Sequence, residues 1–249
     1  MQPKLSVITI VYNNVRDIER TMLSVLNQTY PNIEYIIIDG DSTDGTREII
    51  EKYSKKLAKF VSEEDKGIYD AMNKGLALAT GDYVLFMNSG DEIYDAETVS
   101  QVFDTAPGAD IYYGETEMYN DNWESLGQRR HQAPDTFDWH SFKHGMCISH
   151  QAIYVKRNLA VSYDLRYKYS ADIDWIIRAA KNASSIVNTN IYVAKYLVGG
   201  MSKQKHWASL KERFRIFTKY YGLIPNVINH FWIAINIAQY FVRHGRTND

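Results

Sequence analysis

Residues 34–53 read EYIIIDGDSTDGTREIIEKY, and their pattern indicates how the chain folds. An unbroken apolar run leads into Asp39, a loop of Asp, Ser, Thr and Gly follows, and Thr46–Tyr53 has apolar residues at helical spacing. A short apolar run without alternation is typical of a strand that is buried on both faces of a sheet. A buried strand followed by a polar turn and a helix is the repeating unit of parallel α/β sheets.

The same unit recurs on both sides of this stretch. The predicted buried strands are Leu5–Tyr12, Glu34–Asp39, Phe60–Glu63 and Tyr83–Met87. The predicted helices between and after them are Asp17–Gln28, Thr46–Tyr53 and Ile68–Ala79. The sequence therefore predicts the α/β class, with a mostly parallel central sheet that is flanked by helices.

The pattern is less regular after residue 95. Strands are predicted at Ile111–Gly114, Ile153–Val155 and Ser185–Lys195, and a helix is predicted at Asp172–Lys181. The polar and aromatic stretch 115–145 has no clear period, which predicts a sheet edge with a long loop. Residues 203–249 are predicted to form a C-terminal helical extension.

Composition narrows the class of protein. The net charge of -2 does not favour a nucleic-acid partner. Cys147 is the single cysteine, so no internal disulfide is expected, which fits a cytoplasmic protein. The apolar run Leu5–Tyr12 is too short for a signal peptide, and without 18 uninterrupted apolar residues a spanning helix is not expected.

Polar clusters follow each of the four predicted strands. They begin at Tyr12, Asp39, Glu63 and Asn88. Ligands of parallel α/β sheets bind beyond the carboxyl ends of the strands, which lie at one edge. Any one cluster could equally be a capped turn, but four in succession favour a ligand site. Neither the G-x-G-x-x-G of dinucleotide-binding folds nor a phosphate-binding P-loop is present.

Two aspartates stand out as candidates for chemistry. Asp91 suits a hard divalent cation, Mg²⁺ or Mn²⁺, which prefers oxygen ligands from one or two carboxylates and substrate phosphates. The alternative is that Asp91 caps the turn or helix that follows it. Asp172 lies at the start of a predicted helix, where it could be an N-cap or a general base. The sequence leaves both alternatives open.

Taken in order, these segments resemble the inverting glycosyltransferases of family 2, which have the GT-A fold. The resemblance rests on residues 6–13, on 37–46 as a D-G-x-S-x-D-G-T loop, on 65–75, and on 81–91. Weaker matches lie at 150–151, 171–172 and 199–202. A segment similar to residues 65–75 is common in the family members that act on bacterial surface polysaccharides.

The resemblance implies roles for individual residues. Donor-binding residues would be Thr9, Tyr12, Asn13, Asp39, Asp65, Asp70, Lys74, Asn88 and Ser89, with Asp39 facing the base. Asp91 would bind the metal and the diphosphate, and Asp172 would deprotonate the acceptor hydroxyl. His150 and Gln151 would lie near the acceptor.

The chain departs from the family at two places. Many members have an aspartate-rich D-x-D-D metal motif, where this chain has Asn88, Ser89, Gly90 and Asp91. Only one carboxylate remains, which implies weaker metal binding or a different ligand set. Many members also carry an acidic residue where this chain has Ala171, which leaves open whether Asp174 shares the role of the base.

The resemblance implies a hexosyltransferase that moves a sugar, with inversion, from a nucleotide sugar to a hydroxyl of a glycan or lipid-linked acceptor. A UDP-sugar is the expected donor, and bacterial polysaccharide biosynthesis the expected process. Residues 1–202 would be the catalytic domain, with residues 1–95 for the nucleotide and 96–202 for the acceptor. The alternatives are a non-catalytic nucleotide-sugar binder and a sugar nucleotidyltransferase. The latter normally needs an early Gly-rich basic loop, which Tyr12-Asn13-Asn14 is not.

The predicted extension combines two kinds of segment. The basic residues Lys203, Lys205, Lys211, Arg213, Arg215 and Lys219 accompany a single acid, Glu212. Residues 223–242 are apolar and aromatic, with polar interruptions, which is compatible with a helix in a membrane interface. Peripheral attachment to the inner face of the cell membrane is one expectation. Packing on the catalytic domain or on a second subunit is the alternative, and the oligomeric state is left open.

Overall fold

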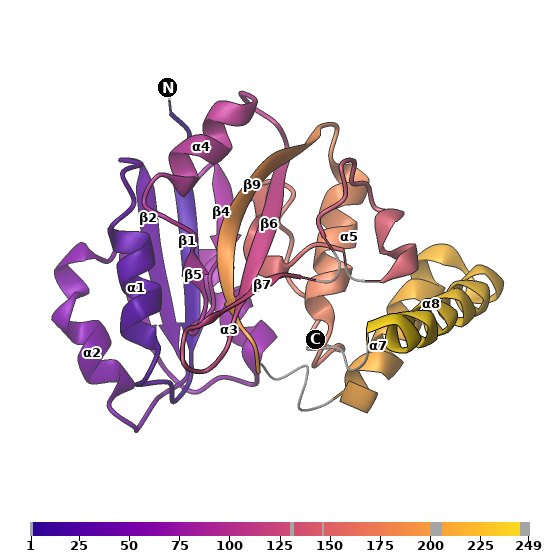
Figure 1. The fold of residues 1–249 in the computed structure, drawn as a ribbon. Coiled ribbons are helices and arrows are strands. Elements are labelled where there is room, and N and C mark those ends of the chain that lie inside the picture. Colours follow the sequence, from indigo (N-terminus) through magenta and orange to yellow (C-terminus); the bar gives the residue numbers. More distant parts are fainter. Residues whose placement is uncertain (1, 130–131, 146, 200–205, 245–249) are drawn as a thin grey trace.

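The structure is a computed structural model that describes residues 2–129, 132–145, 147–199 and 206–244. One sheet runs through the molecule with helices on both faces (Figure 1). The order of its strands is β3-β2-β1-β4-β8-β6-β9-β5, and β7 pairs with β6 outside this path. This arrangement confirms the predicted α/β fold.

The first half of the sheet is parallel, as predicted. Strand β1 (Leu5–Val11) lies between β2 (Ile33–Asp39) and β4 (Tyr83–Phe86), and β3 (Lys59–Ser62) extends the sheet beyond β2. The helices of this half are α1 (Ile18–Leu26), α2 (Thr46–Lys52) and α3 (Ile68–Leu78), and a short 3₁₀ helix, η1 (Ser54–Lys56), precedes β3. The carboxyl ends of β1 and β2 therefore lie side by side, because Val11 pairs with Asp39.

Alternate residues of β1 face two separate apolar cores. Ile8 and Ile10 pack toward α3 and α5 (Ala171–Asn182), whereas Leu5 and Val7 pack toward α1 and α4 (Thr98–Thr105). Because both faces are covered, the strand reads as a continuous apolar run. Helix α3 lies close to the sheet at Gly75, where an added Cβ would stand 2.4 Å from Ile8, so only glycine fits there.

The second half of the sheet is mixed. The remaining strands are β5 (Glu92–Ile93), β6 (Ile111–Tyr119), β7 (Ser125–Gln128), β8 (Ile153–Lys156) and β9 (Ile186–Leu197), with 3₁₀ helices η2 (Ser141–His144) and η3 (His150–Ala152). Strand β8 is antiparallel to β4 and β6, whereas β6 and β9 are parallel. The stretch expected to be irregular from residue 115 instead begins as the continuation of β6. The inner half of β6 was predicted as Ile111–Gly114, but its outer half could not be recognised, because it pairs with residues distant in the sequence.

The extension consists of α7 (His206–Tyr221) and α8 (Leu223–His244). Helix α7 does not stand apart from the rest of the fold, because Ile216 and Phe217 are buried in the same core as α5. Glu212 accepts hydrogen bonds of 2.8 Å from the backbone N–H groups of Lys168 and Tyr169. Within the described residues, no helix is long and apolar enough to cross a membrane. The boundary at residue 202 stays a prediction about domains, but packing continues across it.

Candidate active site

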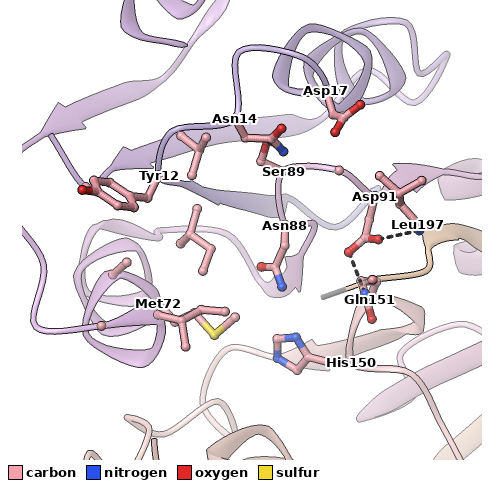
Figure 2. A pocket seen from close by; sticks show the side chains of 18 of the residues that line it. Tyr12, Asn14, Asp17, Met72, Asn88, Ser89, Asp91, His150, Gln151 and Leu197 are labelled. Carbon is pink, nitrogen blue, oxygen red and sulfur yellow. Dashed lines mark hydrogen bonds between the residues drawn. The ribbon is translucent and has the colours of Figure 1, made fainter. Parts of the chain in front are cut away.

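The carboxyl-terminal ends of β1, β2 and β4 open onto one cavity of about 1210 Å³. Predicted site residues that line it are Tyr12, Asn13, Asp65, Asn88, Ser89, Asp91, His150, Gln151 and Asp172. Predicted site residues outside its lining are Thr9, Asp39, Asp70 and Lys74. Figure 2 shows how Tyr12, Asn88, Asp91 and His150 surround this space. The four polar clusters therefore meet at one edge of the sheet, as the sequence predicted.

Two asparagines tie the loop after β1 to the neighbouring loops. Asn13 has a positive φ of 48°, which asparagine tolerates better than most residues, and its N–H donates to Ser42 Oγ at 2.8 Å. The N–H of Asn14 donates to Thr46 Oγ1 at 3.0 Å, and its side-chain amide donates to Ser89 Oγ at 2.9 Å. The role of Asn14 was not predicted. Together these bonds fix the ends of β1, β2 and β4 relative to one another.

Asp39 lies beneath the cavity wall and is fully buried. Its carboxylate accepts hydrogen bonds from the N–H of Ser42 and, at 2.6 Å, from Ser62 Oγ. Thr9 is also fully buried, with its hydroxyl 3.0 Å from that of Tyr35. In this structure Asp39 supports the loop around Ser42, and Thr9 contacts Tyr35 inside the sheet. Direct contact of either residue with a nucleotide stays a prediction.

A cluster of charges closes the cavity beside Tyr12. Lys74 Nζ lies 2.6 Å from Asp65 Oδ1, and Asp70 accepts the N–H of Lys66 at 3.0 Å. Burial raises the pKa of Asp65, and the ammonium of Lys74 opposes that rise. Only Asp65 of these residues lines the cavity, so contact of Asp70 or Lys74 with a donor stays a prediction.

Asp91 is buried at the base of the cavity. Its Oδ2 accepts a 2.6 Å hydrogen bond from Gln151 Nε2, and its Oδ1 accepts the N–H of Leu197 at 3.1 Å (Figure 2). Burial raises the pKa of Asp91 to about 7, although both hydrogen bonds oppose the rise. Both Asp91 oxygens thus bond to residues distant in the sequence rather than to the turn that follows, and α4 begins only after Glu97, so the capping alternative does not explain Asp91.

The residues at this point suit a divalent cation only in part. Asn88 lies three residues before Asp91, and its Oδ1 atom is buried without a hydrogen-bond partner among the described residues. This oxygen is therefore a second candidate ligand. No group of three or more His, Cys, Asp or Glu side chains within the described ranges could hold a metal. A Mg²⁺ or Mn²⁺ ion would thus need further oxygens from substrate phosphates, as such ions commonly do.

His150 and Gln151 line the cavity, and another side chain already bonds to one polar atom of each. His150 Nε2 lies 2.6 Å from the hydroxyl of Tyr163, and its ring stacks on Phe86. Burial lowers the pKa of His150 to about 4, so the imidazole is neutral at physiological pH. His150 can shape an acceptor pocket as an uncharged ring, and Gln151 holds Asp91.

Asp172 projects into the cavity from the first turn of α5. The N-cap residue of α5 is Ser170, so the alternative in which Asp172 is the N-cap is wrong. Tyr69 donates a 3.0 Å hydrogen bond to Asp172 Oδ1. Asp174 is instead buried against α7, where it pairs with Arg178 at 2.7 Å and Lys219 at 2.8 Å. Asp174 therefore cannot share the role of a base at this cavity.

Several cavity residues escaped the sequence analysis. These are Arg129, Lys168, Tyr196 and Arg213. They come from different elements and belong to no motif, and a basic residue in a polar stretch looks like ordinary surface. Tyr196 lies near both candidate aspartates: burial is the main cause that raises its pKa, and the charges of Asp91 and Asp172 add to the rise.

Comparison with known proteins agrees with this geometry. The sequence model described as Glycosyl transferase family 2 matches residues 6–161. A PGL/p-HBAD biosynthesis glycosyltransferase of Mycobacterium bovis BCG is 32% identical over 213 residues, which cover 80% of this chain and 79% of the relative. A putative teichuronic acid biosynthesis glycosyltransferase of Bacillus subtilis, TuaG, is 45% identical over 94 residues, covering 36% of this chain and 37% of the relative.

Solved structures share the fold. Residues 1–349 of Staphylococcus aureus TarS, in complex with UDP-GlcNAc, match with a TM-score of 0.68 and 20% identity, over 98% of this chain and 74% of that one. The mannosyltransferase PcManGT of Pyrobaculum calidifontis, in complex with GDP-Man and Mn²⁺, matches with a TM-score of 0.66 and 16% identity, over 99% and 77%. With the family match over residues 6–161 and the similarity to the mycobacterial enzyme, the chain belongs to glycosyl transferase family 2.

Proposed function

We propose that this glycosyltransferase transfers a sugar from a nucleotide sugar to an acceptor hydroxyl, with inversion at the anomeric carbon. The observation that carries the proposal is that Asp91 and Asp172 line the same cavity, which is large enough for a donor and part of an acceptor. A single displacement requires one carboxylate on the side of the diphosphate and another on the side of the acceptor.

The donor would lie along the carboxyl ends of β1, β2 and β4. Its base and ribose would rest near Tyr12, Asn13 and the loop that Asp39 supports, and its diphosphate would lie toward Asp91. A divalent cation held by Asp91, and by the free Oδ1 of Asn88, would neutralise charge on the departing diphosphate. This ligand set is smaller than the usual aspartate motif, so the diphosphate itself would complete it.

The acceptor would approach from the side of α5. The carboxylate of Asp172 takes the proton of the acceptor hydroxyl while that oxygen attacks the anomeric carbon and the nucleoside diphosphate leaves. Tyr69 holds the carboxylate in position through its 3.0 Å hydrogen bond. The helix N-terminus favours the ionised form of Asp172. Placing both substrates in one cavity supplies part of the rate enhancement.

A UDP-sugar is the proposed donor, and a glycan or lipid-linked molecule is the proposed acceptor. The fold matches that of TarS in complex with UDP and with UDP-GlcNAc, and the Bacillus relative is described as acting in teichuronic acid biosynthesis. PcManGT has GDP-Man in place of a UDP-sugar, so the base must be tested. We place the reaction in bacterial polysaccharide biosynthesis at the inner face of the cell membrane.

A thermal-shift screen of nucleotide sugars, with and without Mn²⁺, tests the donor. Bound ligand raises stability with the logarithm of its concentration over Kd, so UDP and one UDP-sugar should raise the melting temperature. Product formation with polyprenyl-linked and soluble glycans then tests transfer. If no nucleotide stabilises the protein, the proposed function is wrong. Tight donor binding without transfer to any acceptor would favour the non-catalytic binder, and synthesis of the nucleotide sugar would favour the nucleotidyltransferase.

We also propose that α8 lies in an anionic membrane surface. Asn226 and His230 face α7, where Asn226 donates to the carbonyl of Phe214 and His230 packs on the Phe214 ring. The other side of α8 exposes apolar side chains at helical spacing, each between 52% and 74% accessible: Leu223, Ile224, Val227, Ile228, Phe231 and Trp232.

Charge on the extension supports a lipid surface as the occupant of that apolar side. Helix α8 contains no acidic residue, and the only acid of α7, Glu212, is buried. The exposed side of α7 presents Lys211 and Arg215 at helical spacing. Basic residues near a bilayer favour an anionic leaflet by about 1 kcal/mol each.

A further inference from the structure

Four cations that the proposed reaction does not use line the cavity: Arg16, Arg129, Lys168 and Arg213. Arg16 pairs with Asp17 and Asp121, and Arg129 donates to Ser149 Oγ at 2.7 Å. Arg213 comes from α7, and its Nε atom is buried without a hydrogen-bond partner among the described residues. A buried guanidinium N–H without a partner is unusual, because burial of an unsatisfied charged donor is costly. Because the Arg213 side chain lines the cavity, an anionic group there would pair with its guanidinium.

Glu212 places Lys168 at the same wall. Its carboxylate accepts the N–H groups of both Lys168 and Tyr169 at 2.8 Å, so it fixes the loop that precedes α5 against α7. The hydroxyls of Ser170 and Ser209 lie 3.0 Å apart and make a second link between the same segments. Both carboxylate oxygens of Glu212 are therefore engaged by backbone. Within the described ranges, neither Lys168 nor Arg213 forms an ion pair.

The wall that Lys168 and Arg213 form lies on the side of the cavity that carries the proposed base, Asp172. Lys168 and Asp172 come from one short segment, the end of the loop and the first turn of α5. Asp65, one of the acidic lining residues, lies elsewhere, beside Gly40 and Tyr12 at the ends of β1 and β2. Lys168 thus brings a positive charge to the segment that carries the proposed base, where the acceptor would enter.

We infer that Arg213 and Lys168 form a binding site for an anionic group, a phosphate or a carboxylate, that the acceptor carries close to the hydroxyl deprotonated by Asp172. The inference rests on the proposed function and names the acceptor class. Guanidinium N–H groups pair in a fork with two oxygens of a phosphate or carboxylate, which orients the acceptor as well as holding it. The C-terminal extension then completes the acceptor site.

Anion titrations of the full chain test the site. Methyl phosphate and acetate, each titrated by calorimetry with and without saturating UDP, represent the two chemistries. The parent protein should bind at least one of them in the presence of UDP. Arg213→Gln and Lys168→Gln should each weaken that binding at least about tenfold, because each removes a charge-assisted hydrogen bond. Lys211→Gln, a change to an exposed lysine of α7 outside the cavity lining, is the matched control and should leave binding unchanged.

The outcomes separate this inference from the proposed function. Anion binding that is competitive with UDP, or an Arg213→Gln protein whose main defect is weaker UDP binding, would assign the cations to the donor diphosphate and overturn the inference. Absence of binding by both anions in the parent protein would also overturn it. Failure of the parent to bind UDP would count against the proposed function alone, because the anion titration without UDP is independent of it. Methyl phosphate bound more tightly than acetate identifies a phosphate-bearing acceptor, and the reverse identifies a carboxylate.

Discussion

The side-chain amide of Gln151 donates a 2.6 Å hydrogen bond to Asp91, so the residue proposed to bind the metal is held by one expected near the acceptor. Gln151 belongs to η3, which follows the long irregular segment, whereas Asp91 follows β4. The bond therefore joins the half of the chain that carries the nucleotide motifs to the half that follows it. It also leaves Asp91 with fixed geometry in a buried position, which suits a ligand that binds a cation without rearrangement.

Replacing Asp91 should remove metal-dependent nucleotide binding. Asp91→Ala is expected to lower the affinity for UDP in the presence of Mn²⁺ by more than about tenfold, since it removes the one carboxylate at this point. Asp104→Ala, at an exposed position of α4, is the control. Calorimetric titration of UDP, at several Mn²⁺ concentrations, measures the effect. An unchanged dependence on Mn²⁺ in Asp91→Ala would remove Asp91 from the metal site.

Replacing Asp39 should weaken nucleotide binding more than replacing Ser62, whose hydroxyl donates a hydrogen bond to Asp39. Asp39→Ala removes the carboxylate that fixes both Ser42 and Ser62, and it is expected to weaken UDP binding by more than about tenfold. Ser62→Ala deletes only one of these hydrogen bonds and should cost less. Affinity for UDP measured on both variants decides the matter. Equal losses would mean that Asp39 acts only through Ser62.

The first half of the fold could be predicted because its strands are buried on both faces. An apolar run such as Leu5–Val11 needs no knowledge of its neighbours to be read as a strand. The outer half of β6 is different, since Glu115 and Glu117 interrupt the apolar pattern and the strand forms through pairing with β9. Pairing between segments so distant in the sequence has no local signal.

The residues of the site also divide into those that the sequence predicts and those that it does not. Tyr12, Asp91 and Asp172 reach the cavity because each follows or begins an element whose position the pattern predicts. Asp39 belongs to the same motif, yet its side chain turns beneath the wall, and a motif does not say which way a side chain turns. Arg213 could not be predicted at all, because its place depends on the docking of α7 through Glu212.

Glu34 should make stability depend on acid pH. Burial alone would raise the pKa of Glu34, but hydrogen bonds from Lys4, Ser6 and Thr80 outweigh it and lower the pKa to about 2. A carboxyl whose pKa is lowered on folding stabilises the protein at pH values above its usual pKa of 4.5. That contribution is lost as the pH falls from 4.5 toward 2.

Glu34→Gln is therefore expected to lower the free energy of unfolding by about 2 to 3 kcal/mol at pH 7, and by little near pH 2. Urea unfolding at a series of pH values measures the difference. Glu51→Gln breaks an exposed ion pair with Arg47 and serves as the control, with little change expected at any pH. A Glu34→Gln deficit that stays constant down to pH 2 would show that the loss is one of packing rather than of charge.

The apolar side of α8 should bind vesicles. The parent protein is expected to sediment with phosphatidylglycerol vesicles and much less with phosphatidylcholine. Phe231→Ser with Trp232→Ser should weaken this binding at least about tenfold, since two large apolar side chains no longer leave water. Val161→Ser with Leu165→Ser changes two exposed apolar residues outside the extension and is the matched control. Unchanged sedimentation together with a smaller particle mass in solution would show that α8 is a subunit contact instead.

Asp172 and Asp174 should separate catalysis from stability. Asp172→Asn keeps the shape of the side chain and its bond from Tyr69 but removes its basicity, so transfer should fall by about 10² or more while UDP affinity and melting temperature stay near those of the parent. Asp174→Asn lies in the same turn but breaks the pairs that its buried carboxylate makes with the partly exposed Arg178 and Lys219, so it should lower stability by about 1 to 3 kcal/mol. Product formation per folded molecule, measured below the melting temperature of both variants, is the decisive quantity. For Asp174→Asn that quantity should remain close to the parent value, because this carboxylate faces α7 rather than the cavity. Normal turnover by Asp172→Asn would place the base on another residue.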